Sequence, residues 1–197
     1  MKRTAILVAL AAFSTALAVR AQSNGAADDS QSCAYDRAAL LALEEQSFDQ
    51  DLEGGWRAVA RQQGCLEAAA NLIRDYREAN GLSSYILFWH EAQLRAYSDD
   101  TQPAIALFEQ SYKAPDDGLG WNIYVDATVA FMRGDREALL AARKRLVALP
   151  EPPNRFTVDV NGNEIEPPPW PPNLRVVDNL IRCYERTYAE AYSRCAE

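Results

Sequence analysis

The four cysteines are the residues of this chain best suited to chemistry, and their spacing favours two disulfides over a metal site. They are Cys33, Cys65, Cys183 and Cys195. Disulfides form in oxidising compartments, and four cysteines allow three pairings, of which we favour Cys33 with Cys65 and Cys183 with Cys195. We expect no metal and no cofactor, because the chain has one histidine and no cysteines in C-x-x-C spacing.

The pairing of Cys183 with Cys195 constrains the last part of the chain. In one unbroken helix, the stretch between these two cysteines would span about 18 Å. Bridged Cα atoms lie about 6 Å apart. We therefore predict a C-terminal helix over 173–195 that bends at Arg186-Thr187-Tyr188.

His90 is the single histidine and the one candidate for acid–base catalysis. Its neighbour Glu91 is not expected to orient it, because adjacent residues on a helix do not face each other. Glu44 and Glu45 lack the aromatic cleft that glycoside chemistry needs, and the sequence has no nucleophile elbow, phosphate loop, zinc-protease motif or dinucleotide fingerprint. We predict that the protein is not an enzyme and has no catalytic residue; the alternative is a hydrolase that uses His90.

A repeated pattern of helices positions these residues. Trp56, Trp89 and Trp121 recur after 33 and 32 residues, and the Ala-rich amphipathic runs that follow them recur after 36 and 34. This period is typical of stacked helix pairs. We predict an all-α fold of about three right-handed helix pairs, with further helices at both ends.

Apolar periodicity and turn residues give the boundaries of these helices. An N-terminal helix is expected over 36–48. The three pairs are expected at 56–62 with 66–79, 84–97 with 103–113, and 119–132 with 136–149.

The region 151–172 differs from the rest in composition. A small β-hairpin is expected near 156–166, with Asn161-Gly162 as its two-residue turn and with Val158 opposite Ile165. A Pro-rich strap follows and ends at Pro172. Either it is a recognition ligand for another protein, or it is a rigid connection that returns Trp170 to the helices as a plug.

The predicted helix pairs resemble the tetratricopeptide repeat family. In the last predicted pair, Ala138 and Pro150 fall at the positions of the alanine and the closing proline of the family's repeat. In the middle pair, Ala104 and Phe108 also fall where the family's repeat has such residues. The first unit departs from the pattern, because Trp56 stands where a small residue is usual. The resemblance covers about half of the chain, with degenerate motifs.

The resemblance implies a concave groove lined by the first helix of each pair. The residues it places there, called the candidate groove below, are Trp89, Gln93, Tyr97, Ile123, Ala127 and Phe131. Such a groove would be apolar and aromatic, without the Lys and Asn clamps that some family members use to hold a terminal carboxylate. The alternative is that these side chains are core, packed under the hairpin, the strap or the last helix.

The first residues predict export. Lys2 and Arg3 precede an uncharged apolar run, which makes 1–21 a secretory signal peptide with a cut before Gln22. The run is shorter than the ~20 residues that cross a bilayer, so no membrane insertion is expected after cleavage. Residues 22–32 would be a flexible leader and 33–197 a single domain, periplasmic or secreted.

The charge of the chain disfavours nucleic acid as a partner. Loss of the expected signal peptide would change the net charge from −8 to −11, and such a chain repels polyanions. We therefore expect an exported helical-repeat protein that binds an unidentified protein or peptide through the candidate groove. The alternatives are a small envelope hydrolase or its accessory subunit, and a structural scaffold whose groove is self-filled.

Overall fold

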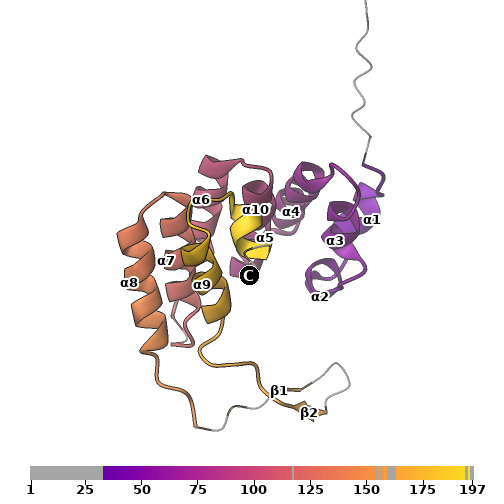
Figure 1. Ribbon diagram of the computed structural model, residues 1–197. Helices are drawn as coiled ribbons and strands as arrows, with labels where there is room; N and C mark the ends of the chain where they lie inside the picture. Colours follow the sequence, from indigo (N-terminus) through magenta and orange to yellow (C-terminus); the bar gives the residue numbers. More distant parts are fainter. Residues whose placement is uncertain are drawn as a thin grey trace, which may run out of the picture. The chain divides into compact units, whose positions relative to one another are not determined.

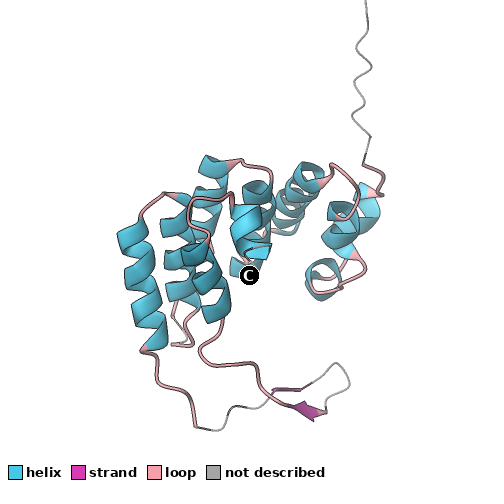
Figure 2. Ribbon diagram, in the orientation of Figure 1, coloured by secondary structure: helices cyan, strands magenta, loops and turns pink. Residues whose placement is uncertain are grey.

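The computed structural model describes residues 33–116, 118–153, 155, 157–158, 163–193 and 195, and these residues are mostly helical (Figure 1, Figure 2). The described residues belong to one compact unit, 31–197. The expected signal peptide, the leader and the Asn161-Gly162 turn lie outside the described residues.

Ten helices occur in the described part of the chain. They are α1 (Arg37–Leu41), α2 (Glu45–Asp49), α3 (Gly55–Ala60), α4 (Leu66–Asn80), α5 (Tyr85–Tyr97), α6 (Thr101–Gln110), α7 (Trp121–Met132), α8 (Arg136–Val147), α9 (Leu174–Arg182) and α10 (Tyr188–Ser193).

The expected N-terminal helix over 36–48 is wrong in one respect, because the structure has two short helices there. Two carbonyl groups of this segment accept hydrogen bonds from side chains of α4. The Tyr76 hydroxyl donates to the carbonyl of Leu43 at 2.7 Å, and Asn80 donates to that of Leu41 at 3.2 Å. A carbonyl bound in this way is satisfied without a continuing helix, so the chain turns between α1 and α2.

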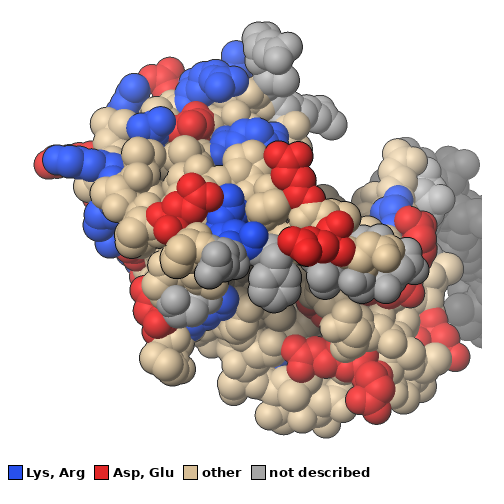
Figure 3. Space-filling model, turned by 90° about the horizontal axis from the view of Figure 1, so that it is seen from below, with Lys and Arg blue, Asp and Glu red and all other residues tan. Residues whose placement is uncertain are grey.

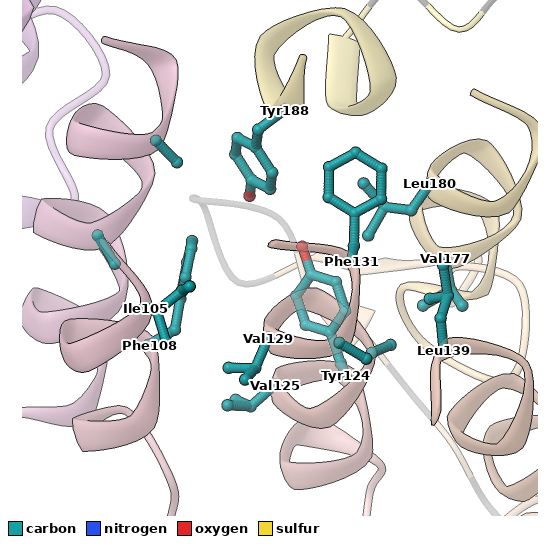
Figure 4. Packing of buried hydrophobic residues seen from close by; sticks show 14 of the residues in the cluster. Ile105, Phe108, Tyr124, Val125, Val129, Phe131, Leu139, Val177, Leu180 and Tyr188 are labelled. Carbon is teal, nitrogen blue, oxygen red and sulfur yellow. The ribbon is translucent and has the colours of Figure 1, made fainter. Parts of the chain in front are cut away.

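Consecutive helices from α3 to α8 pack against one another. One buried cluster lies among α2 to α5 and includes Phe48, Leu72 and Tyr76. A second cluster lies among α5 to α10, and Figure 4 shows its side chains converging from several helices. The helix α5 serves both clusters, since Leu87 lies in the first and Trp89 in the second. A helix with apolar residues on several faces is buried on several faces.

The C-terminal helices return to this array. The helix α9 packs against α7 and α8, and α10 packs against α9 and α5 (Figure 1). The helix expected over 173–195, with a bend at Arg186-Thr187-Tyr188, is two separate helices, and the break between them spans 183–187. The start of α10 is a capping box, in which the backbone N–H of Glu190 donates to Oγ1 of Thr187 while the Glu190 carboxylate accepts from the Thr187 N–H.

Both favoured cysteine pairs are bonded in the structure. Cys33 is bridged to Cys65 with a Cα–Cα distance of 5.7 Å, and Cys183 to Cys195 with one of 5.9 Å. The first bridge ties the segment before α1 to the start of α4. The second ties the end of α9 to the residues after α10.

Two short strands, β1 (Thr157–Val158) and β2 (Glu164–Ile165), pair antiparallel between α8 and α9. The expected register is wrong by one residue, because Thr157 lies opposite Ile165 and Val158 opposite Glu164. This register leaves an odd number of residues between Val158 and Glu164, whereas a two-residue turn would leave an even number.

The Pro-rich strap is attached at the end of α8. Trp170 donates from Nε1 to the carbonyl of Leu149 at 3.1 Å, and the Arg155 guanidinium lies 5.4 Å from the centre of the Trp170 ring. Arg155 also donates to the carbonyl of Pro168 at 2.7 Å. In the structure, these contacts hold Trp170 at Leu149, and the side chains that cover the candidate groove come from elsewhere.

Candidate functional site

The candidate groove is formed by two helices, and most of its aromatic surface is buried. Each helix presents residues at i, i+4 and i+8, which places them along one face. Trp89 is 3% exposed and Phe131 7%, and Ala127 is fully buried. Gln93, Tyr97 and Ile123 are half-buried. The structure thus places all six residues in or beside the second buried cluster.

Trp89 is the centre of the buried part of the groove. Its ring lies 4.7 Å from that of Phe108, 5.0 Å from that of Trp121 and 4.7 Å from that of Tyr124, measured between centroids. These contacts come from α6 and α7, so Trp89 joins three helices. An aromatic residue in this position contributes chiefly to packing.

The part of the groove nearer the end of α5 is covered by three tyrosines that are not among the predicted groove residues. Tyr184, Tyr188 and Tyr192, the C-terminal plug, lie on or just before α10. The ring of Tyr188 is 5.5 Å from that of Tyr97 and 6.3 Å from that of Phe131. Tyr184 lies 6.2 Å from Phe131, and Tyr192 lies 5.9 Å from Tyr97. The four-residue spacing of Tyr188 and Tyr192 is the sequence signal that could have indicated one apolar face of a helix, whereas Tyr184 lies in the turn before α10.

Burial keeps the phenols of Tyr188 and Tyr97 neutral. Desolvation raises the pKa of Tyr188 and that of Tyr97 well above the ordinary range, and nearby Tyr192 adds to both shifts. Gln93 Nε2 donates to the Tyr188 hydroxyl at 3.5 Å. Figure 4 shows Tyr188 reaching from the C-terminal segment toward Phe131 and Tyr124 of α7. A cavity of roughly 170 Å³, lined in part by Phe131 and Tyr184, opens beside the plug.

A second polar site connects the N-terminal helices to α5. The Asp49 carboxylate is 1% exposed, lies 2.6 Å from Nδ1 of His90, and accepts a hydrogen bond from Nε1 of Trp56 at 2.9 Å. Gln50 donates to its other oxygen. Burial opposes ionisation of Asp49, but the contacts with His90, Trp56 and Gln50 outweigh it and lower the pKa of this carboxyl.

The pair of Asp49 and His90 has the arrangement by which a carboxylate orients a catalytic imidazole. Among the described residues, the hydrogen-bond partner of the His90 side chain is Asp49, and no hydroxyl or thiol nucleophile bonds to it. The pair therefore ties α2 to α5. A polar pocket of roughly 490 Å³, lined by Asp49, Glu45 and Tyr85 among others, lies beside it.

Glu91, the sequence neighbour of His90, points to a different set of partners. It is 2% exposed and accepts hydrogen bonds from Arg77 at 2.5 Å and from Arg95 at 2.9 Å. As expected for adjacent helical residues, the two side chains diverge. Glu91 thus joins α4 to α5 through buried charge.

In the part of the chain that the structure describes, no group of three or more His, Cys, Asp or Glu side chains could hold a metal ion. Within the same part, no helix has the length and apolar character needed to cross a membrane.

The charged side chains are unevenly distributed on the face shown in Figure 3. Basic residues gather on the left of that view, the side on which α8 lies in Figure 1, and acidic residues prevail on the right. The helix α8 carries Arg136, Arg143, Lys144 and Arg145, while Glu44, Glu45, Asp51 and Glu53 surround α2.

Comparison with known proteins gives this chain no relative. No protein-family model matches it, and neither does any curated protein or solved structure.

Proposed function

We propose that this protein is an exported interaction module that acts by binding rather than by catalysis. Its binding surface would be the candidate groove, and its ligand an unidentified protein or peptide. The helices α3 to α8 would form three tetratricopeptide-like pairs, with the short ladder of β1 and β2 as an appended hairpin. The consecutive packing of these helices supports the repeat arrangement.

One observation supports the proposal: a side chain of the short helix α10 packs against residues of the candidate groove. Tyr188 of α10 is 3% exposed and contacts rings contributed by α5, α6 and α7, namely Tyr97, Phe108 and Phe131. Insertion of an amphipathic helix into an apolar groove is a recurrent mode of peptide recognition. The packing of α10 against these rings supports a groove whose ligand would be a helix with similar aromatic side chains.

The proposed compartment is the periplasm or the extracellular space. Two disulfides are compatible with an oxidising environment, and the apolar run behind Lys2 and Arg3 supports a signal peptide. With its cysteines bridged, the domain would be held at both ends of the described chain.

A structural scaffold is the second candidate function. In that case the C-terminal plug would cover the groove permanently. A small hydrolase or its accessory subunit is a third, and the contact of Asp49 with His90 is the observation in its favour. A turnover that depends on His90 would identify the hydrolase.

Site-specific photocrosslinking in the native exported fraction tests the binding proposal. A photoreactive residue replaces Tyr97, which lies on α5 beneath the plug. In the control, it replaces Leu52, which lies between α2 and α3 and is 70% exposed. A partner captured from position 97 and not from position 52 supports binding at the groove. Equal capture from both positions, or none from position 97, contradicts it.

A further inference from the structure

We infer that the ligand of the candidate groove is a helix with tyrosines four residues apart and a small residue just before the second one. We infer also that the Cys183–Cys195 bridge keeps the chain's own copy of such a helix in the ligand's place. This inference rests on the proposed function and names the partner and the regulation of that site.

The chemistry of the ligand follows from the residues of α10 that face the groove. Tyr188 and Tyr192 lie one helical turn apart, and their rings are 5.5 and 5.9 Å from that of Tyr97. Ala191, between them on the same face, is fully buried. A small side chain at this position allows the helix backbone to approach the groove, while the two flanking rings supply the contact area.

The groove also distinguishes tyrosine from a purely apolar anchor. Gln93 donates to the Tyr188 hydroxyl at 3.5 Å, and Gln93 is itself half-buried. A buried amide without a partner loses free energy relative to one in water. A ligand with phenylalanine in place of this tyrosine would leave the Gln93 amide without that acceptor.

The plug needs the Cys183–Cys195 bridge to stay in place, because α10 is short. It spans six residues, Tyr188–Ser193, whereas isolated helices shorter than about 12–15 residues are marginal in water. The bridge closes a loop with a sequence separation of 12 between Cys183 and Cys195. Loop-closure entropy for this length corresponds to about a hundredfold change in the population of the released segment.

Access to the groove should therefore depend on whether this bridge is present. Its removal by substitution leaves the plug attached through 183–187 but without its second anchor. An external helix then competes with a tethered segment whose effective concentration is on the order of millimolar. In the oxidised protein the same helix competes with a segment fixed at both ends.

The test is fluorescence polarisation with a fluorescein-labelled peptide of residues 184–193, titrated with the mature chain. Three proteins are compared: the wild type, the Cys183→Ser/Cys195→Ser variant, and the Cys33→Ser/Cys65→Ser variant, which loses the distant bridge. Circular dichroism establishes that each protein is folded. The peptide should bind the Cys183→Ser/Cys195→Ser variant about 10–100-fold more tightly than the wild type, and the Cys33→Ser/Cys65→Ser variant should resemble the wild type.

A second variant opens the groove with both bridges intact. Ala191→Glu places a larger charged side chain in the fully buried position of α10 and should also strengthen peptide binding. A peptide with alanine at the positions of Tyr188 and Tyr192 should not bind any of the proteins. The inference is overturned if the tyrosine-free peptide binds as well as the labelled peptide. It is also overturned if neither Cys183→Ser/Cys195→Ser nor Ala191→Glu binds the labelled peptide more tightly than the wild type.

The peptide titration and the photocrosslinking experiment can be contradicted independently of each other. If photocrosslinking at position 97 captures a partner but the tyrosine peptide does not bind, the groove is a binding surface for a different kind of ligand. If position 97 captures nothing and the peptide binds more tightly after the bridge is removed, the groove accepts such a helix once α10 is released, but the proposed binding of an external partner in the exported fraction fails.

Discussion

The Asp49 carboxylate lies 2.6 Å from Nδ1 of His90, so residues 41 positions apart share one buried hydrogen bond. Asp49 belongs to α2 and His90 to α5, and Trp56 of α3 donates to the same carboxylate oxygen. A single buried carboxylate thus holds three helices, which gives it a large effect on stability and a defined dependence on pH.

Asp49→Asn should destabilise the protein by about 1–3 kcal/mol at neutral pH, because charge-assisted hydrogen bonds are lost from a buried position. The pKa of Asp49 is lowered in the folded state. Its stabilisation is therefore present above the unfolded pKa of about 3.9 and is lost as the pH falls through the lower folded value. Urea unfolding at several pH values should show the difference between wild type and variant shrinking below about pH 4.

Glu67→Gln is the control for Asp49→Asn. Glu67 is an exposed carboxylate in the first turn of α4, so its replacement should change stability by less than about 1 kcal/mol. A pH dependence of Asp49→Asn that is parallel to that of the wild type would show that the buried carboxylate is not the titrating group.

Glu91→Gln should be more damaging than the loss of a surface ion pair. Arg77 and Arg95 are largely buried around Glu91, and removal of one partner of such a cluster costs about 3–5 kcal/mol. Glu109→Gln removes the exposed pair with Arg133 and should cost less than about 1 kcal/mol. Chemical denaturation of both variants gives the comparison, and equal losses would contradict the buried network.

Gly55→Ala should disrupt the start of α3. Gly55 has φ +53°, and a Cβ built there would lie 1.9 Å from the carbonyl oxygen of Phe48. Gly81 has a similar φ of +62° but open space around it, so Gly81→Ala should cost only about 1 kcal/mol for the left-handed conformation. Thermal melting should therefore show a larger loss for Gly55→Ala, and a similar loss for both would mean that the segment moves to relieve the clash.

Cys33→Ser/Cys65→Ser should cost about 4 kcal/mol by the loop-closure argument, because the bridge joins residues with a sequence separation of 32. The same argument gives about 3 kcal/mol for the shorter loop between Cys183 and Cys195. Unfolding in urea under non-reducing conditions measures both. A smaller loss for the longer loop would show that residual structure in the unfolded chain, and not loop length, sets the difference.

The sequence predicted the helices best where apolar periodicity was sustained. The expected ranges for α4, α5, α7 and α8 differ from the observed ones by a few residues at most. The prediction was wrong over 36–48, because the hydrogen bond from Tyr76 to Leu43 joins residues that only the folded chain brings together. The predicted register of β1 and β2 was wrong by one residue, because Thr157 and not Val158 lies opposite Ile165.

The polar site of Asp49 and His90 was also only partly predictable from the sequence. His90 was recognisable as a candidate because it is the single histidine, but Asp49 was one carboxylate among many. Its burial arises from the packing of α2 against α3 and from contacts with His90 and Trp56, which no spacing in the sequence indicates.

By itself, the sequence determined the helical character of the fold. It favoured the pairing of Cys33 with Cys65 and of Cys183 with Cys195 over the other possible pairings, and for the second pair it required a bend between the two cysteines. Periodicity and the reach of a disulfide are local properties, so they can be evaluated without a tertiary structure. Only the tertiary structure decided that Tyr188 covers Tyr97 and Phe131 while Trp170 lies at Leu149. Both aromatic residues were available to fill the groove, and the choice depended on which segment the folded helices and the second disulfide bring to that surface.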